Sequence, residues 1–195
     1  MLSHLQPYNI FLASKSPRRQ ALLKGLDIEF AIRTKETDEE FPEHLKADEI
    51  VLYLSKKKAD AFSGELQIKD ILITADTIVW INNRVLNKPE NRTEAIEMLK
   101  LLSGKKHTVY TGVCITASSF QTQFVGSTQV WFKELTLAEI DYYLDHYKPY
   151  DKAGSYGVQE WIGYIGIDRI EGCFYNVMGL PLNLLYAHLR DIPLH

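Results

Sequence analysis

Hydrophobic and polar positions repeat with two different periods along the chain, and these periods predict which segments are helices and which are strands. Apolar residues at steps of three and four favour helices, whereas short unbroken apolar runs favour strands. The predicted strands cover residues 9–13, 29–33, 71–80, 108–117, 123–132 and 164–170, and the predicted helices cover residues 16–25, 47–62, 91–104, 136–147 and 181–189. Because strands and helices interleave, the expected fold class is α/β, in a single domain over residues 1–195.

Local signals sharpen some of these elements. The run 71–80 has no polar alternation, which predicts a strand buried on both faces. Ser16 followed by Pro17 predicts a helix start, with serine as the N-cap and proline at the first helical position. The pairs Asn91/Glu94 and Thr136/Glu139 have capping-box spacing at the starts of two further helices.

Composition excludes several classes of protein. Hydrophobic residues make up 46% of the chain and charged residues 24%, which is typical of a globular protein and not of a disordered one. Two cysteines are too few for a disulfide scaffold. A net charge of −3 argues against a generally basic nucleic-acid coat. Without a signal-peptide pattern or a long apolar run, we expect a soluble cytoplasmic protein that binds neither membrane nor nucleic acid.

Charge is unevenly distributed near the N-terminus. Residues 1–35 hold six Lys and Arg and two acidic residues, which is a net charge of +4. Residues 36–50 hold seven acidic residues and one Lys, which is a net charge of −6. A basic segment beside an acidic one suits a polyanion together with a metal ion. Two solvated surface segments explain the same pattern.

The basic segment places cations at a helix start. Lys15, Arg18 and Arg19 surround the N-terminus of the helix that begins at Ser16. Cations are electrostatically unfavourable there unless an anion binds, because the helix N-terminus is itself positive. Backbone N–H groups, the hydroxyls of Ser14 and Ser16, and the guanidinium groups could then converge on phosphate oxygens. Arginines that point into solvent are the alternative.

Two carboxylates are candidates for metal binding or catalysis. Asp76 lies in the most apolar predicted strand, where an ionised carboxylate needs a partner. A metal ion, a positioned water or backbone hydrogen bonds would each provide one. Glu39, in the acidic segment, could share a divalent cation with Asp76, since such ions take carboxylate and phosphate oxygens. A solvated acidic loop is the alternative for Glu39.

Two weaker signals follow. Lys88 stands before a proline and could place a point charge on a phosphate. The loop 151–159 contains two glycines that let backbone approach a ligand, and Gln159 offers the donor and acceptor needed to read the edge of a base. A simple turn is the alternative. The chain has no P-loop, no dinucleotide-binding fingerprint and no nucleophile elbow.

Taken together, these segments resemble the Maf family of nucleoside triphosphate pyrophosphatases, the septum-formation inhibitor proteins. The matching stretches occur in family order and cover most of the chain. They are 12–19 with Leu22 and Leu23, 75–79, 87–89, 98–104 with His107, 151–159, and 177–182.

The resemblance implies an elongated mixed central sheet with flanking helices and a cleft between two lobes, as in the inosine triphosphate pyrophosphatases. It also implies hydrolysis of a nucleoside triphosphate to monophosphate and pyrophosphate with a divalent cation, Mg²⁺ or Mn²⁺. House-cleaning of non-standard nucleotides, a link to cell-division arrest and a homodimer come with the family. The implied site residues are Asp76 for catalysis, Asp76 and Glu39 for metal, and Ser14, Arg18, Arg19, Lys58 and Lys88 for the triphosphate.

The subgroup is also implied. Members that act on dTTP and UTP resemble this chain at Arg18, Thr77 and Gln159, which we therefore expect to determine specificity and to bind substrate. Asn87 and Glu160 depart from the usual pattern, and Glu160 bears on the width of the base pocket. The alternatives are a pyrophosphatase for 7-methyl-GTP or another modified nucleotide, and a regulator of septum formation that binds nucleotides without turnover.

Overall fold

The computed structural model describes residues 2–192 and contains seven strands, seven α-helices and two short 3₁₀ turns in that range. The strands are β1 (Asn9–Leu12), β2 (Ala31–Ile32), β3 (Asp70–Ile81), β4 (Arg84–Leu86), β5 (Lys106–Ala117), β6 (Gln121–Phe132) and β7 (Ile167–Glu171). The helices are α1 (Pro17–Lys24), α2 (Asp48–Asp60), α3 (Arg92–Leu102), α4 (Leu137–Tyr147), α5 (Trp161–Gly166), α6 (Phe174–Val177) and α7 (Leu182–Arg190), with 3₁₀ turns at Ser3–Leu5 (η1) and Ala153–Ser155 (η2).

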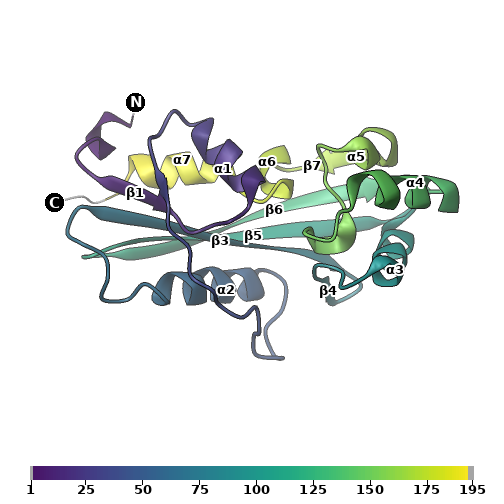
Figure 1. Ribbon diagram of the computed structural model, residues 1–195, viewed down its shortest axis with the longest axis horizontal. Coiled ribbons are helices and arrows are strands. Elements are labelled where there is room, and N and C mark those ends of the chain that lie inside the picture. The colour runs from purple at the N-terminus through teal and green to yellow at the C-terminus, as the bar shows by residue number, and fades with distance from the viewer. Residues whose placement is uncertain (1, 193–195) are drawn as a thin grey trace.

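One mixed sheet runs through the whole elongated molecule (Figure 1). Its strand order is β2-β1-β3-β5-β6-β7, with β4 also paired to β3. The pairs β1/β2 and β1/β3 are parallel, and the remaining pairs are antiparallel. β3, β5 and β6 have 12 residues each. At about 3.3 Å per residue each strand is about 40 Å long, which is long enough to carry two separately packed lobes.

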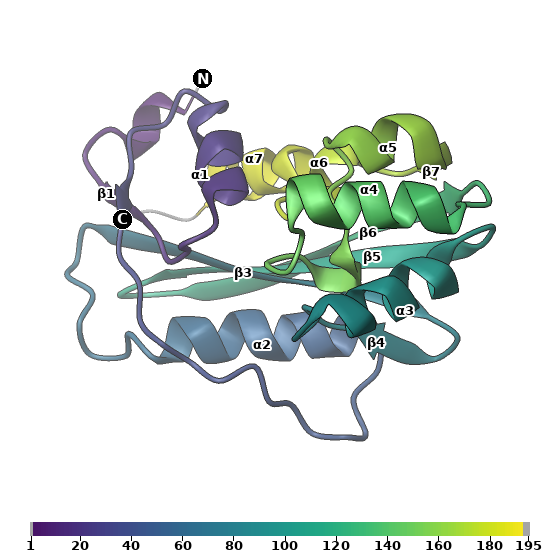
Figure 2. The ribbon, with the colours of Figure 1, turned by 45° about the vertical axis from the view of Figure 1, so that its right-hand side comes forward.

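Three hydrophobic clusters cover this sheet. The first packs α1 and α7 on one half of it, and the second packs α3, α4 and α5 around the other half. The third lies under α2, on the sheet face opposite α1 and α7 (Figure 2). Along β3, Ala75 belongs to the first cluster, Ile78 to the third and Val79 to the second. Asp76 and Thr77 therefore lie where the two lobes meet.

The edge of β3 is open at this junction. β1 pairs with residues 70–73 of β3, and β4 pairs with residues 79–81. Between them no strand within the described residues covers this edge, whereas the other edge pairs continuously with β5. Backbone groups exposed along such a gap need other partners. The cleft described below lies against this gap.

Most predicted elements are confirmed. β3 is buried on both faces, and the long strands predicted at 108–117 and 123–132 form the antiparallel pair β5/β6. Ser16 caps α1, and Thr136 and Glu139 form a reciprocal capping box on α4. The box predicted at Asn91 is only half present, because Glu94 Oε2 accepts from the backbone N–H of Glu90 instead of that of Asn91.

The strand predicted at 164–170 is wrong in its first half, where α5 precedes β7. A short apolar run does not distinguish a strand from a buried helix, and here packing decides. Ile162 is fully buried in the second cluster, and Gly163 lies so close to Val158 that any Cβ would clash with its carbonyl oxygen. The strand predicted at 29–33 shrinks to the two residues of β2 at the sheet edge.

Candidate active site

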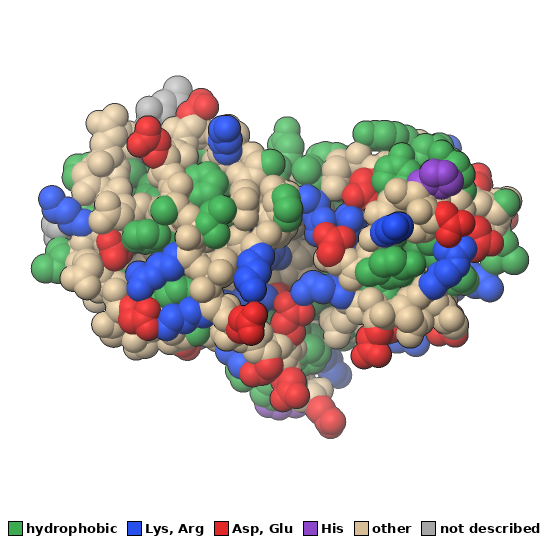
Figure 3. Space-filling view, in the orientation of Figure 1, with side chains coloured by type: hydrophobic (Ala, Val, Ile, Leu, Met, Phe, Trp, Pro, Cys, Tyr) green, Lys and Arg blue, Asp and Glu red, His purple; other side chains and the backbone are tan. Residues whose placement is uncertain are grey.

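A cleft of about 830 Å³ lies between the two lobes (Figure 3). Lysine, arginine and carboxylate side chains surround its mouth. All nine residues predicted for the site line it: Ser14, Arg18, Arg19, Glu39, Lys58, Asp76, Thr77, Lys88 and Gln159. These residues come from segments far apart in the sequence. The structure therefore brings the predicted residues into one cavity.

The start of α1 forms one wall of the cleft. Ser16 has extended backbone angles, and its side chain accepts a hydrogen bond from the Arg19 N–H, as an N-cap does. The buried hydroxyl of Ser14 accepts from the N–H of Ser16 at 3.2 Å. No acidic side chain lies in the first turn. The positive end of the helix therefore faces the cleft without a carboxylate of its own helix to neutralise it.

Arg19 braces the open edge of β3. Its Nη1 donates to the carbonyl of Ala75 at 2.9 Å, its Nη2 to Thr77 Oγ1 at 2.9 Å, and its Nε to the carbonyl of Gly179 at 2.8 Å. Three of its five N–H groups are thus bonded to protein, and two remain for a ligand. Burial lowers the pKa of Arg19, and the charge of Asp76 opposes that shift.

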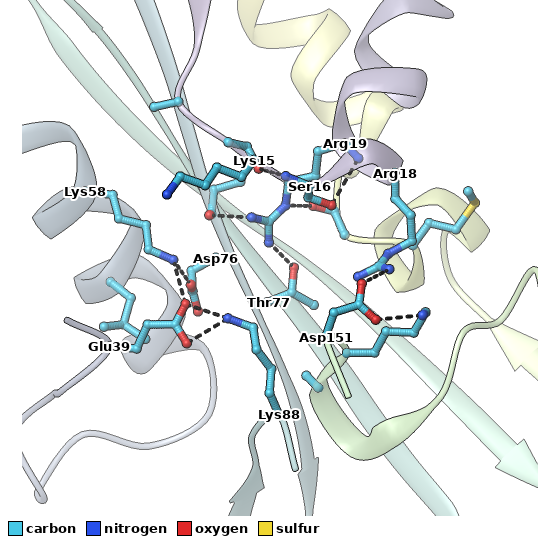
Figure 4. A pocket seen from close by; sticks show the side chains of 18 of the residues that line it. Lys15, Ser16, Arg18, Arg19, Glu39, Lys58, Asp76, Thr77, Lys88 and Asp151 are labelled. Carbon is cyan, nitrogen blue, oxygen red and sulfur yellow. Dashed lines mark hydrogen bonds and ion pairs between the residues drawn. The ribbon is translucent and has the colours of Figure 1, made fainter. Parts of the chain in front are cut away.

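Asp76 lies at one end of a chain of alternating charges that continues through Lys58 and Glu39 to Lys88 (Figure 4). Its Oδ1 accepts from Lys58 Nζ of α2, and that ammonium also lies 3.3 Å from Glu39 Oε1. Lys88 Nζ donates to both oxygens of Glu39, at 2.8 and 3.0 Å. Burial alone raises the pKa of Glu39, but the two lysines outweigh it, so the pKa is lowered. Glu39 is therefore held as an anion.

The donor set fits a hard divalent cation. Asp76 and Glu39 both contact Lys58 Nζ, so two carboxylates already converge around one positive charge. Residues 2–192 contain no cluster of three or more His, Cys, Asp or Glu side chains suited to a metal ion. Mg²⁺ typically takes one or two carboxylates and completes its coordination with substrate phosphate and water. Asp76 and Glu39, which both line the cleft, can supply these two carboxylates.

The second lobe contributes its own ion pairs. Arg18 Nη1 donates to Asp151 Oδ2 at 2.8 Å, and Lys152 Nζ donates to Asp151 Oδ1 at 2.7 Å. Lys152 also lies 3.1 Å from Glu160 Oε1. Burial raises the pKa of Asp151, but Lys152 and Arg18 lower it further than burial raises it. Arg18, Asp151, Lys152 and Glu160 therefore form one chain of ion pairs between the lobes.

The far end of the cleft is lined by the loop 151–159. Gln159 Oε1 is buried, and no donor within the described residues reaches it. A buried acceptor without a partner is costly, so this oxygen is suited to a donor on a ligand. Tyr156 lines the same wall, and its hydroxyl contacts His107 Nε2 at 2.7 Å.

Sequence reasoning missed four of these features. Asp151, Lys152 and Tyr156 all line the cleft, although the loop that contains them was noted only for its glycines and Gln159. The segment 34–38 also lines the cleft, beside Glu39. The sequence did offer a signal, because two charged residues, Asp151 and Lys152, stand side by side just before Ala153 and Gly154.

The fold type is shared with a solved structure of low sequence identity. The Staphylococcus aureus Ham1 protein aligns with a TM-score of 0.51 and 14% identity, over 95% of this chain and 100% of that chain. This likeness concerns the fold. It confirms the expected α/β class, an elongated mixed central sheet with flanking helices.

The chain belongs to the Maf-like protein family, whose model matches residues 9–192. The "dTTP/UTP pyrophosphatase" of Bacteroides thetaiotaomicron is 51% identical over 193 residues, which are 98% of this chain and 100% of that protein. The "dTTP/UTP pyrophosphatase" of Porphyromonas gingivalis is 52% identical over 194 residues, covering 98% of each chain. Within residues 2–192, no helix is both long enough and apolar enough to cross a membrane.

Proposed function

We propose that this protein hydrolyses nucleoside triphosphates, dTTP and UTP above all, to the monophosphate and pyrophosphate. One observation carries the proposal. A cleft lined by a helix N-terminus, two arginines and five lysines also holds a buried carboxylate, in a chain about half identical to named dTTP/UTP pyrophosphatases over nearly its whole length. The cations suit a triphosphate, and the carboxylate suits activation of water.

The triphosphate lies against α1 in this proposal. Arg18 offers a planar fork to phosphate oxygens, while Lys58 and Lys88 act as point charges. Ser14 orders the backbone before the helix, and the two remaining N–H groups of Arg19 face the same anion. Arg18, Lys58 and Lys88 are now paired with carboxylates, so the substrate exchanges one anion for another.

Asp76 orients and deprotonates the attacking water in this proposal. Its position on β3, between Lys58 and the open strand edge, lets one oxygen stay paired while the other faces the cleft. Asp76 and Glu39 would hold a divalent cation, Mg²⁺ or Mn²⁺. When bound, such an ion neutralises phosphate charge and lowers the pKa of a coordinated water. The protein holds the reacting atoms in line for displacement of pyrophosphate.

The base lies against the loop 151–159 in this proposal. The N3–H of thymine or uracil would donate to the unpartnered Gln159 Oε1, and the amide nitrogen would donate to a base carbonyl. Cytosine lacks that N3–H, which explains a preference for dTTP and UTP. The other two specificity positions are Arg18 and Thr77, and the Thr77 hydroxyl accepts a hydrogen bond from Arg19. The specificity assignment therefore depends on three residues on different sides of one cleft.

The experiment is a nucleotide panel scored for released pyrophosphate, with and without Mg²⁺. We expect dTTP and UTP to be the best substrates and CTP, GTP and 7-methyl-GTP to be poor ones. A preference for 7-methyl-GTP would replace the proposed base assignment. Absence of metal-dependent pyrophosphate release from every nucleotide would favour a regulator without turnover.

We propose further that residues 1–195 act as a single domain, because one sheet supplies strands to both lobes. The homodimer and the cytoplasmic location stay predictions. So does a contribution to house-cleaning of non-standard nucleotides or to cell-division arrest.

A further inference from the structure

Two groups outside the predicted site, the buried Tyr143 and the largely covered Glu160, hold the loop 151–159. Tyr143 of α4 has no exposed surface, and its hydroxyl accepts a hydrogen bond from the backbone N–H of Gly157 at 3.0 Å. The same hydroxyl donates to Glu160 Oε2. Burial and Glu160 both raise the pKa of Tyr143, so the hydroxyl stays protonated and keeps donating.

Glu160 closes the loop into a ring. Its second oxygen, Oε1, lies 3.1 Å from Lys152 Nζ, and these two side chains are only 19% and 9% exposed. The backbone of Gly157 packs directly on the carboxylate, since a Cβ there would lie 2.7 Å from the carboxyl carbon of Glu160. The Glu160 carboxylate therefore holds the two ends of the segment 152–160 together. It accepts a hydrogen bond from Tyr143, forms an ion pair with Lys152 and packs against the backbone of Gly157.

This ring determines where Gln159 lies. Gln159 immediately precedes Glu160, and its backbone carbonyl accepts from the Tyr164 hydroxyl at 2.8 Å. Its side-chain oxygen has no donor within the described residues, so no protein group anchors that end of the carboxamide. The position of the carboxamide then depends on the backbone that carries it. A backbone fixed in advance spares the ligand the entropy cost of ordering it.

We infer that Tyr143 and Glu160 are positioning residues for base recognition. They hold the loop so that Gln159 faces the base, and neither touches the triphosphate. This inference rests on the proposed function, because it assigns the base to the Gln159 side of the cleft. It gives a role to Glu160, one of the two positions at which the sequence departs from the usual family pattern.

The test compares Tyr143→Phe with Tyr142→Phe on the same helix. Tyr143→Phe removes the hydroxyl that holds Gly157 and Glu160. Tyr142, in contrast, is 44% exposed, and its ring stacks on His146 and lies tilted against Trp161. For Tyr143→Phe we expect the KM for dTTP to rise about tenfold, kcat to stay within about twofold, and the preference for dTTP over CTP to fall. Tyr142→Phe should match the wild type.

Inorganic tripolyphosphate separates positioning from a general loss of structure, because it carries no base. Its inhibition constant should be the same in Tyr143→Phe and in the wild type. Glu160→Gln is the second variant, since it keeps an acceptor for Tyr143 and removes the charge that pairs with Lys152. We expect a smaller loss of dTTP affinity and of base preference in Glu160→Gln.

Two results would overturn the inference: an unchanged KM and base preference in both variants, or an equal weakening of dTTP and tripolyphosphate. Failure of the proposed function is a separate result. If the wild type releases no pyrophosphate from any nucleotide, calorimetric dTTP binding replaces KM as the readout. The same contrast is then expected, with dTTP weakened about tenfold and tripolyphosphate unchanged.

Discussion

Arg18 of α1 reaches across the cleft to Asp151 of the opposite lobe, with Nη1 2.8 Å from Oδ2. The arginine side chain is 23% exposed and the aspartate 59%, so the pair lies at the cleft mouth. A triphosphate carries more negative charge than one carboxylate, and its oxygens can accept two parallel hydrogen bonds from the guanidinium fork. We therefore expect substrate binding to exchange this contact for a phosphate contact and to keep the guanidinium charge compensated.

Arg18→Ala should weaken nucleotide binding. We expect the KM for dTTP to rise about tenfold or more, because a charge-assisted hydrogen bond to phosphate contributes about 1.5–3 kcal/mol. Steady-state kinetics with dTTP and UTP measure the change. Arg18→Lys should recover part of the affinity, since it keeps the charge and loses the fork. Arg33→Ala is the matched control, because Arg33 pairs with Glu65 and does not line the cleft. Unchanged KM and kcat in Arg18→Ala would remove Arg18 from the site.

Asp76→Asn should abolish turnover and leave the fold intact. The substitution keeps the shape of the side chain but removes the basic oxygen, so kcat on dTTP should fall about 10²–10⁴-fold. Asp70→Asn on the same strand is the control, because Asp70 is also buried but bonds to Asn9 and the backbone of Gln67. It should alter stability and leave kcat near wild type. A wild-type kcat in Asp76→Asn would refute the proposed mechanism.

Periodicity and local chemistry predict most of the fold. The unbroken apolar run of β3 indicates its double burial, and Ser16-Pro17 and Thr136/Glu139 mark helix starts that the structure confirms. Lys58 stands within the apolar face of α2, which places its stem against the sheet and its ammonium beside Asp76. The helix at α5 was not predictable, because its apolar run suits either period until Ile162 is packed.

The sequence reveals some residues of the site but not which side chains contact one another. Asp76 is recognisable from the sequence because a lone carboxylate in an apolar strand needs a partner. Its actual partner, Lys58, lies 18 residues earlier, and the Arg18–Asp151 pair spans 133 residues. Such pairs depend on how the lobes pack, which no spacing rule encodes. The resemblance supplied Lys58 and Lys88 as ligands for phosphate, but not the carboxylates that hold them now.

Metal removal should stop pyrophosphate release, and Glu39→Gln should weaken metal dependence in a graded way. Chelation by EDTA should abolish activity on dTTP, and added Mg²⁺ or Mn²⁺ should restore it. In Glu39→Gln we expect the Mg²⁺ concentration for half-maximal activity to rise about tenfold or more, because one of two carboxylate ligands is lost. Glu40→Gln, at the exposed neighbouring position, controls for the loss of charge in the loop. Full activity in EDTA would exclude a metal-dependent reaction.

His107 should make the protein less stable in mild acid. Burial lowers its pKa from 6.5 to about 3, and its Nε2 is held by the Tyr156 hydroxyl. Its contribution to stability is complete above pH 6.5 and is lost as the pH falls toward 3, because only the unfolded chain binds the proton there. Between pH 7.5 and 5.5 this group alone should remove about 1.4 kcal/mol from the free energy of unfolding.

Urea unfolding at both pH values measures that loss. The loss should be smaller in His107→Gln by about 1.4 kcal/mol, because the variant has no imidazole to protonate on unfolding. His44→Gln, at an exposed position, should keep the wild-type loss. Equal losses in His107→Gln and in the wild type would contradict the assignment of the acid sensitivity to this histidine.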